Sequence, residues 1–267
     1  MEETYKMENA CPTKEALTKP KKKDLGIKDV RFVIAVGSGK GGVGKTTIST
    51  FIAFGLKDLG YTTGIFDLDF YGPNLPLLVK TKKIPLPTGT GNLKPIIIDG
   101  LRMLSLGFLL KEDSPIFMRG LMAGKLLQEL TKKVDWGPLD FLILDLPPGT
   151  GDIFLTMFDI FEIEGFILIT TPHKLSISDG IRTISILKEK QIPIFGVIKN
   201  MTNLFPESHP YFEEFLKKYK LPLIAEIPIL EALSQIEYIE DFGKNEEIRN
   251  ITTSLAKKIE ELVFRIY

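Results

Sequence analysis

The sequence predicts a doubly wound α/β fold, in which helices cover both faces of one mostly parallel sheet. Short segments that are apolar throughout recur along the 267-residue chain, and segments with apolar residues at helical spacing separate them. Strands that are apolar throughout are buried on both faces, which is typical of parallel sheets between two helical layers. No internal repeat is visible, so a single large domain is expected.

The first elements are a strand, a glycine-rich loop and a helix. Residues 31–36, which are apolar after Arg31, predict a buried strand. Apolar residues recur at helical spacing from Ile48 to Leu59, and Gly60 follows as a typical helix stop signal. Residues 63–67 predict the second strand.

The alternation of strands and helices continues to the C-terminus. The expected elements are two short strands within 93–107, a helix at 119–134, strands at 141–145 and 165–171, a helix at about 176–190, a strand at 193–199, a helix near 210–219, a strand at 222–227 and a final helix over 248–266. Residues 1–28 are polar and are expected to be a flexible tail, which leaves 29–267 as the domain. Four lysines among residues 19–23 could bind nucleic acid, but a solvated tail is the preferred interpretation.

The composition is that of an ordinary globular protein. Lysine plus arginine equals aspartate plus glutamate at 34 each, so no net field favours nucleic acid or an anionic membrane. No run of about 18 apolar residues occurs, and the first residues are polar and acidic. Cys11 is the only cysteine, which excludes an intrachain disulfide and favours a reducing compartment. We therefore expect a cytoplasmic protein that binds neither membranes nor nucleic acid.

Residues 39–46 contain the phosphate-loop pattern G-x-x-x-x-G-K-T between a predicted strand and a predicted helix. This geometry directs free backbone N–H groups and the positive helix end at a phosphate. Lys45 would neutralise the outer phosphates of ATP, and the Thr46 hydroxyl would bind Mg²⁺. The loop residues expected to bind the nucleotide are Gly39, Lys40, Gly41, Gly42, Val43, Gly44, Lys45, Thr46 and Thr47.

Three aspartates lie at the ends of predicted strands and are candidates for the magnesium site. Asp145 ends the apolar strand 141–145 and could hold Mg²⁺ through water, although a carboxylate at a strand end could also cap a loop. Asp67 and Asp69 could each orient the attacking water or hold Mg²⁺-bound water. Their i, i+2 spacing predicts that both face the site. The Pro- and Gly-rich segment 147–152 is suited to a switch loop that senses the γ-phosphate.

Several separate motifs carry a resemblance to a known family. They are residues 39–45, 67–73, 106–110, 119–120 and 134–137, and most specifically Asp-Leu-Pro-Pro-Gly-Thr-Gly-Asp at 145–152. With these motifs the chain resembles the Mrp/ApbC-type, or Nbp-type, P-loop ATPases. This branch of the MinD/ParA superfamily is associated with assembling and carrying iron–sulfur clusters.

The resemblance implies a function and a role for several residues. It implies an ATP-gated homodimer that hydrolyses ATP and serves an iron–sulfur assembly or recipient protein. Lys40, a second lysine within the glycine run, would reach across the dimer to the neighbour's nucleotide, much as an arginine finger does. Asp67 takes the water-orienting position and Asp145 the Walker B position. Asn200 matches the asparagine that reads adenine, since its amide can donate and accept at once.

The chain departs from the family pattern at the expected cluster ligands. Such carriers usually have Cys-x-x-Cys shortly after the position of Met201, whereas residues 203–209 contain no cysteine. A homodimer supplies only two Cys11 thiols, and clusters commonly take four, so ligand counting argues against a conventional bound cluster. A partner, exogenous thiols or His209 would have to supply the rest. Cys11 is by default a spare thiol, and His173 is expected to form hydrogen bonds near the interface.

Two other function classes can be weighed on the sequence. A MinD- or ParA-like positioning switch would attach to lipid or DNA when ATP is bound, and a basic amphipathic tail would be its signature. The predicted last helix has few cations at its end and an apolar stripe suited to packing on the sheet. A P-loop kinase would leave Lys40 and the segment 145–149 without a role. Hydrolysis is expected to be slow, because the chain offers no obvious strong base.

Overall fold

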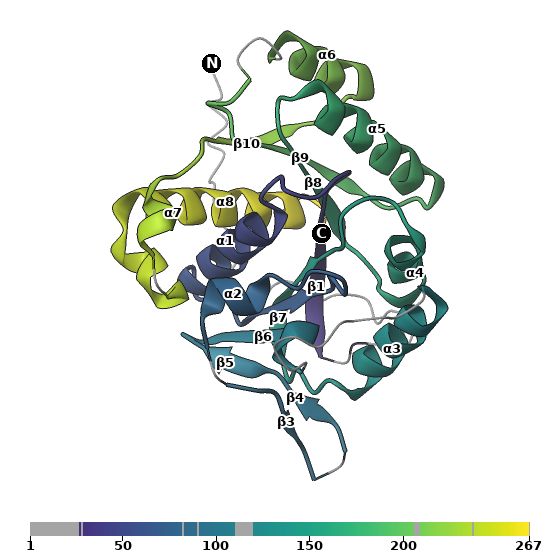
Figure 1. Ribbon diagram of the computed structural model, residues 1–267, viewed down its shortest axis with the longest axis vertical. Helices are drawn as coiled ribbons and strands as arrows, with labels where there is room; N and C mark the ends of the chain where they lie inside the picture. The colour runs from purple at the N-terminus through teal and green to yellow at the C-terminus, as the bar shows by residue number, and fades with distance from the viewer. Residues whose placement is uncertain are drawn as a thin grey trace, which may run out of the picture.

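An eight-stranded sheet forms the centre of the protein in the computed structural model (Figure 1). The structure describes residues 27, 29–81, 83–89, 91–109, 120–205, 209–236 and 238–266. The strand order is β10-β9-β8-β1-β7-β2-β6-β5, and only β5 pairs antiparallel. The strands are β1 (Val30–Gly37), β2 (Thr63–Asp67), β5 (Ile96–Ile98), β6 (Leu101–Ser105), β7 (Leu139–Asp145), β8 (Gly165–Thr170), β9 (Ile194–Asn200) and β10 (Leu223–Ile227).

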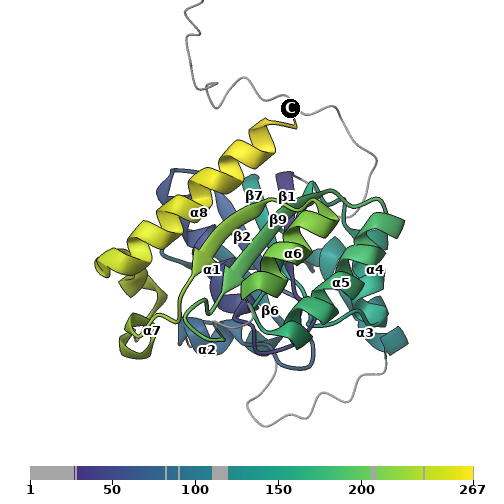
Figure 2. The same ribbon diagram turned by 90° about the horizontal axis from the view of Figure 1, so that it is seen from above.

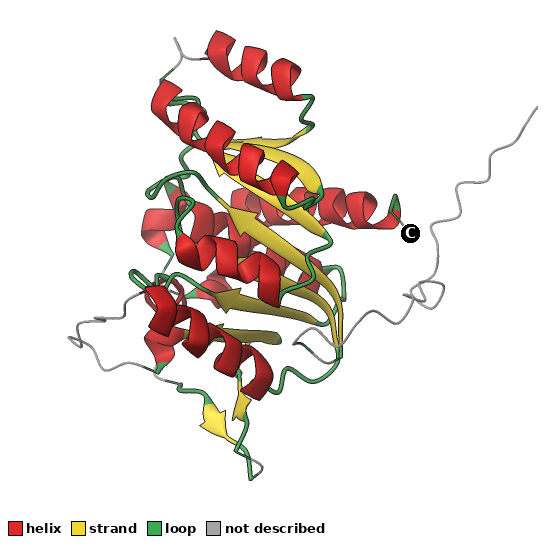
Figure 3. Cartoon of the chain, turned by 90° about the vertical axis from the view of Figure 1, so that its right-hand side faces the viewer, coloured by secondary structure: helices red, strands yellow, loops and turns green. Residues whose placement is uncertain are grey.

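Helices form a layer on each face of this sheet, as Figures 2 and 3 show. The long helices are α1 (Lys45–Asp58) and α8 (Glu246–Phe264) on one face, and α3 (Gly120–Lys133), α4 (Asp152–Ile160), α5 (Lys174–Glu189) and α6 (His209–Tyr219) on the other. The shorter elements are α2 (Leu75–Val79), α7 (Ala232–Gln235), the 3₁₀ helices η2 (Leu106–Phe108) and η4 (Ile239–Lys244), and a hairpin of β3 (Leu86–Pro87) and β4 (Leu93–Lys94).

A hydrophobic core lies between the sheet and each helical layer. In the first core, Phe51 and Phe54 of α1 pack edge-on against Phe242 of η4. In the second, Phe154 of α4 packs edge-on against Phe166 of β8. Full burial of such a side chain contributes roughly 1.5–3 kcal/mol, so both faces of the sheet stabilise the fold. This explains why the inner positions of the central strands, such as 32–36 of β1 and 141–144 of β7, are apolar.

The structure confirms the predicted fold class. The expected strands and long helices are present, and α1 ends before Gly60, which has a positive φ of 87°. Residues 93–107 form three short strands rather than two. The sequence did not reveal α4, because the predicted switch loop runs directly into it and its residues are apolar on most sides. The predicted tail lies outside the described residues, apart from Ile27.

The parallel arrangement gathers the ends of several strands at one edge of the sheet. In the strand register, Asp145 at the end of β7 lies opposite Val36 of β1 and Asp67 of β2. The glycine-rich loop begins one residue further along, after Gly37. Candidate residues from distant parts of the sequence therefore meet at this edge. In the described part of the chain, no helix has the length and apolar character needed to cross a membrane.

Candidate nucleotide-binding site

Residues 38–44 connect β1 to α1 in a tight loop that requires glycine at several positions. Gly42 and Gly44 have positive φ angles of 77° and 84°, which residues with a Cβ rarely adopt. A Cβ on Gly44 would lie 2.3 Å from Nδ2 of Asn200, and a Cβ on Gly39 would lie 2.3 Å from the backbone of Asp179. The loop is therefore packed between α5 and the end of β9.

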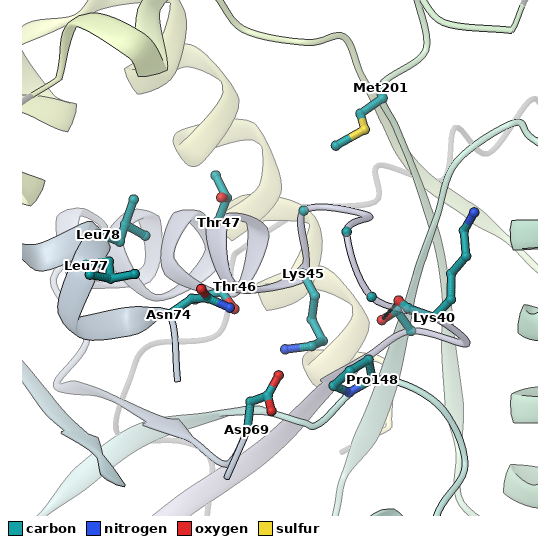
Figure 4. Close-up of a pocket in the computed structure, with 14 residues that line it drawn as sticks. Lys40, Lys45, Thr46, Thr47, Asp69, Asn74, Leu77, Leu78, Pro148 and Met201 are labelled. Atoms are coloured by element: carbon teal, nitrogen blue, oxygen red, sulfur yellow. Dashed lines mark hydrogen bonds between the residues drawn. The ribbon is translucent and has the colours of Figure 1, made fainter. Parts of the chain in front are cut away.

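A pocket of about 540 Å³ opens at the N-terminal end of α1 (Figure 4). The predicted nucleotide-binding residues that line it are Lys40, Gly41, Gly42, Gly44, Lys45, Thr46 and Thr47. No side chain of the described residues caps the N-terminus of α1, and its first turn contains no acidic residue. The free N–H groups and the positive end of the helix are therefore available to an anion. The other three predicted contacts, Gly39, Val43 and Asn200, do not line the pocket.

A buried ion pair lies below the loop. The ammonium of Lys45 is 2.8 Å from Oδ1 of Asp145, and the two side chains are 7% and 0% exposed. The hydroxyl of Ser49 donates to the same oxygen at 2.9 Å. The other oxygen, Oδ2, is buried and has no hydrogen-bond partner among the described residues. A buried carboxylate oxygen without a partner is costly, so this oxygen is a natural acceptor for a magnesium-bound water.

Asp67 and Asp69 occupy different environments, although the sequence predicted that both face the site. Asp67 is buried and accepts hydrogen bonds from N–H of Asp69, N–H of Leu75 and the hydroxyl of Ser105. Asp69 lines the pocket, and its carboxylate points toward the Lys45 ammonium in Figure 4. The expected alternation fails because β2 ends at Asp67, so Asp69 no longer follows strand geometry.

Burial changes the acidity of these carboxyl groups. Burial, followed by the nearby charge of Asp145, raises the pKa of Asp67 from 3.8 to about 7. Burial also raises the pKa of Asp69, although the charge of Lys45 and two backbone N–H groups oppose this change. An ionised Asp67 is therefore less favourable in the folded protein than in the unfolded chain.

This shift predicts how the stability of the nucleotide-free protein depends on pH. Below about pH 4 Asp67 is protonated in both states, and between pH 4 and 7 only the folded state holds the proton. The free energy of unfolding should therefore fall by about 1.4 kcal/mol per pH unit over this range from this group alone. Urea denaturation without magnesium compares the wild type with Asp67→Asn. As pH rises, the free energy of unfolding of the variant should increase relative to that of the wild type. A difference that stays constant from pH 4 to 8 would contradict the assignment.

Asn200 contacts the loop from below. At the end of β9, its Nδ2 donates to the carbonyl of Val43 at 2.8 Å. The next residue, Met201, lines the pocket. The predicted adenine contact of Asn200 stays a prediction; the bond to Val43 uses one N–H of the amide and leaves the second N–H and Oδ1 for a base.

Lys40 lies at the rim of the pocket and differs from Lys45 in its surroundings. Its side chain is half-buried, and Figure 4 shows its ammonium directed away from that of Lys45. No carboxylate of the described residues lies within ion-pair distance of it. The contact of Lys40 with the nucleotide of a second subunit, which the resemblance implied, stays a prediction.

Several residues of the site were not expected from the sequence. Asn74, Leu77 and Leu78 line the pocket from the start of α2. The sequence does contain a signal for this helix, because asparagine is a favoured cap and Pro76 lies in the first turn. Pro148, from the predicted switch loop, also lines the pocket. The N–H of Gly149 donates to the carbonyl of Ser38 at 3.0 Å, so this segment is in contact with the phosphate loop.

The structure tests only part of the predictions for histidine and cysteine. His173 caps α5, since its Nδ1 accepts from N–H of Leu175 at 3.3 Å, and its ring packs against Phe205. The side chain of His209 and all of Cys11 lie outside the described residues. Within the described ranges, no group of three or more His, Cys, Asp or Glu side chains could hold a metal ion. The roles expected of His209 and Cys11 therefore stay predictions.

The glycine loop, the uncapped helix and the lysine–aspartate pair at the sheet edge define a P-loop nucleotide-binding protein. The profile of the ParA family, described as NUBPL iron-transfer P-loop NTPases, matches residues 29–267. The chain belongs to this family, as the motifs predicted.

Individual relatives agree with this assignment. The chain is 41% identical over 208 residues to an iron-sulfur cluster carrier protein of Rickettsia felis. This match covers 78% of the chain and 64% of the relative, so the chain spans less than two thirds of that protein. A nucleotide-binding protein from Archaeoglobus fulgidus, solved in complex with ADP, is 27% identical with a TM-score of 0.64, over 90% of this chain and 93% of that one. MinD from Pyrococcus horikoshii, complexed with Mg-ADP, has the same fold, with a TM-score of 0.67 and 20% identity over 87% and 97% of the two chains.

Proposed function

We propose that the protein binds and hydrolyses ATP and uses this cycle to assist iron–sulfur cluster assembly or transfer. The observation that carries the nucleotide part is the buried Lys45–Asp145 pair beneath a glycine loop whose N–H groups are free to bind phosphate. The solved relative with ADP supports the same assignment. Family membership and the names of the relatives support the iron–sulfur part.

The chain's own residues have distinct tasks in this proposal. The loop N–H groups bind the phosphates, and Lys45 exchanges Asp145 for the outer phosphate oxygens. Thr46, Asp69 and Asp145 would hold Mg²⁺, partly through water, and the unpartnered oxygen of Asp145 fits this role. The metal would neutralise charge on the phosphates. Because Asp69 lines the pocket and Asp67 does not, the placement favours Asp69 for direct contact with water and Asp67 as its support through the Asp69 N–H.

Turnover is proposed to be slow. Among the described residues, no histidine that could act as a general base lines the pocket. The lining residues can contribute to hydrolysis by positioning the reactants and by stabilising charge. Slow hydrolysis suits a protein that binds different partners in its ATP-bound and ADP-bound states. It does not suit an enzyme whose task is to make product. We propose a cytoplasmic homodimer that ATP closes and hydrolysis opens, with Lys40 of one subunit serving the nucleotide of the other.

In this proposal an iron–sulfur cluster is cargo, and the chain alone supplies too few ligands for it. One cysteine per chain gives a homodimer two thiols, fewer than the four that a cluster commonly takes. A recipient or assembly partner would therefore supply further ligands. We propose that the protein works as an accessory ATPase to such a partner.

Iron and sulfide analysis tests the cargo part of the proposal. Protein purified without oxygen should contain background iron when alone, and near-stoichiometric iron and sulfide should accompany it only with a cluster-binding partner present. The matched control is Cys11→Ser, which should behave as the wild type if Cys11 is a spare thiol. Stoichiometric iron and sulfide on the isolated wild type would contradict the accessory role.

A MinD- or ParA-like switch without a cluster is the alternative function. The specific observation in its favour is that one cysteine per chain gives a homodimer only two thiols for a cluster. This alternative predicts that the protein sediments with liposomes or DNA when ATP is present and stays in solution with ADP. Sedimentation that does not depend on the nucleotide would reject it.

A further inference from the structure

A second pocket is separate from the one at the phosphate loop. Its volume is about 450 Å³, and two short segments line it, Lys83, Ile84 and Leu86 on one side and residues 94–97 on the other. It lies where the chain enters the β3–β4 hairpin, beside the edge strand β5. Figure 1 shows this hairpin at its lower end. It shares no lining residue with the nucleotide pocket.

The walls of this groove are apolar and exposed. Ile84, Leu86 and Ile97 are 61%, 62% and 56% exposed, although each lines the groove. Single exposed apolar residues are ordinary, but a contiguous group around a groove is typical of an interaction site. Backbone pairing fixes the walls: β3 pairs with β4, and the carbonyl of Leu93 accepts from N–H of Asp135 at 3.0 Å.

The groove is also positively charged. Lys83 and Lys94 line it, and none of the described residues that line it is acidic. In the described part of the chain, neither lysine is within 4.0 Å of a carboxylate, and Lys83 donates instead to the carbonyl of Ile97 at 3.0 Å. The protein as a whole has equal numbers of acidic and basic residues. The charge at the groove is therefore local and complementary to acidic groups.

The contact between Lys83 and Ile97 indicates the shape of the occupant. Ile97 lies on the outer strand of the sheet, and its carbonyl faces away from β6 because it accepts from Lys83. An extended backbone lying along the groove could donate an N–H to this carbonyl in place of Lys83. The released ammonium could then pair with a carboxylate of the same segment.

We infer that this groove binds an extended segment of a partner protein in which acidic and apolar residues alternate. The apolar side chains would cover Ile84, Leu86 and Ile97, and the carboxylates would pair with Lys83 and Lys94. The inference is independent of the nucleotide site, because it uses other residues at another part of the sheet.

A labelled hexapeptide that alternates glutamate with isoleucine tests this inference, with a lysine–isoleucine peptide as its charge-reversed counterpart. Fluorescence polarisation should show saturable binding of the acidic peptide, at least about tenfold tighter than that of the basic one. Binding should weaken at about 0.5 M salt, because exposed charges contribute to it. Equal binding of the two peptides, or no saturation of the acidic peptide at millimolar concentration, would overturn the inference.

Surface variants locate the binding on the protein. Lys94→Glu and Ile84→Ser should each weaken binding of the acidic peptide about tenfold, because they remove one charge contact or one apolar contact. Lys217→Glu is the matched control, since Lys217 is exposed on α6 at the other end of the sheet. ATP affinity, which also reports that the variants are folded, should be unchanged in all three. If Lys217→Glu weakens binding as much as Lys94→Glu does, the attraction is non-specific and the groove is not the site.

Discussion

Lys45→Ala is expected to lower the affinity for ATP at least about 100-fold and to destabilise the protein at the same time. The loss of affinity follows because Lys45 is the lysine in the pocket that pairs with the buried acid next to the phosphate loop. The loss of stability follows because Asp145, with an exposed fraction of 0%, would keep a buried charge without its partner. Breaking a buried pair on one side costs about 3 kcal/mol or more. Calorimetric titration with ATP and urea denaturation measure the two effects.

A double variant separates the two effects. In Lys45→Ala/Asp145→Asn the buried charge is gone, and the amide oxygen of the asparagine can still accept from the hydroxyl of Ser49. Much of the lost stability should therefore return, while ATP binding should remain weak. A folded Lys45→Ala protein that binds ATP as tightly as the wild type would contradict the assignment of the whole site.

The sequence predicted the parts of the fold and the site that depend on local pattern. Apolar runs such as 141–144 predict a parallel sheet, because strands buried on both faces have few polar positions. The phosphate loop is contiguous in sequence, so its glycines and Lys45 could be assigned without knowledge of the fold. The turn of the phosphate loop and the start of α1 at Lys45 both depend on residues that are neighbours in the sequence.

Contacts between distant residues could not be predicted in the same way. The hydroxyl of Ser105 supports Asp67 across 38 residues, and Asn200 contacts Val43 across 157. Such contacts depend on strand order, and the order β7-β2-β6 cannot be read from local pattern. The different environments of Asp67 and Asp69 depend on a strand that ends at Asp67, and element boundaries are the least reliable part of a sequence prediction.

Lys40→Ala is expected to preserve nucleotide binding and to remove most of the turnover. Binding should stay within about threefold of the wild type, a change below about 1 kcal/mol, because Lys40 points away from Lys45 and pairs with no carboxylate of the described residues. Turnover should fall about 10³-fold if Lys40 neutralises charge on the nucleotide of the other subunit, as arginine fingers do. Single-turnover phosphate release at saturating ATP measures the rate, and full activity of the variant would refute the role.

A mixing experiment shows whether Lys40 acts across the dimer. Lys40→Ala and Asp69→Ala should each be nearly inactive, but a mixed dimer contains one site with an intact Asp69 and a Lys40 from the other subunit. Random exchange makes half of the dimers mixed, so turnover should recover to about a quarter of the wild-type value. A lysine that acts within its own subunit gives no recovery, because each site then lacks either Lys40 or Asp69. Mixed dimers that form and stay inactive would therefore place Lys40 at its own nucleotide.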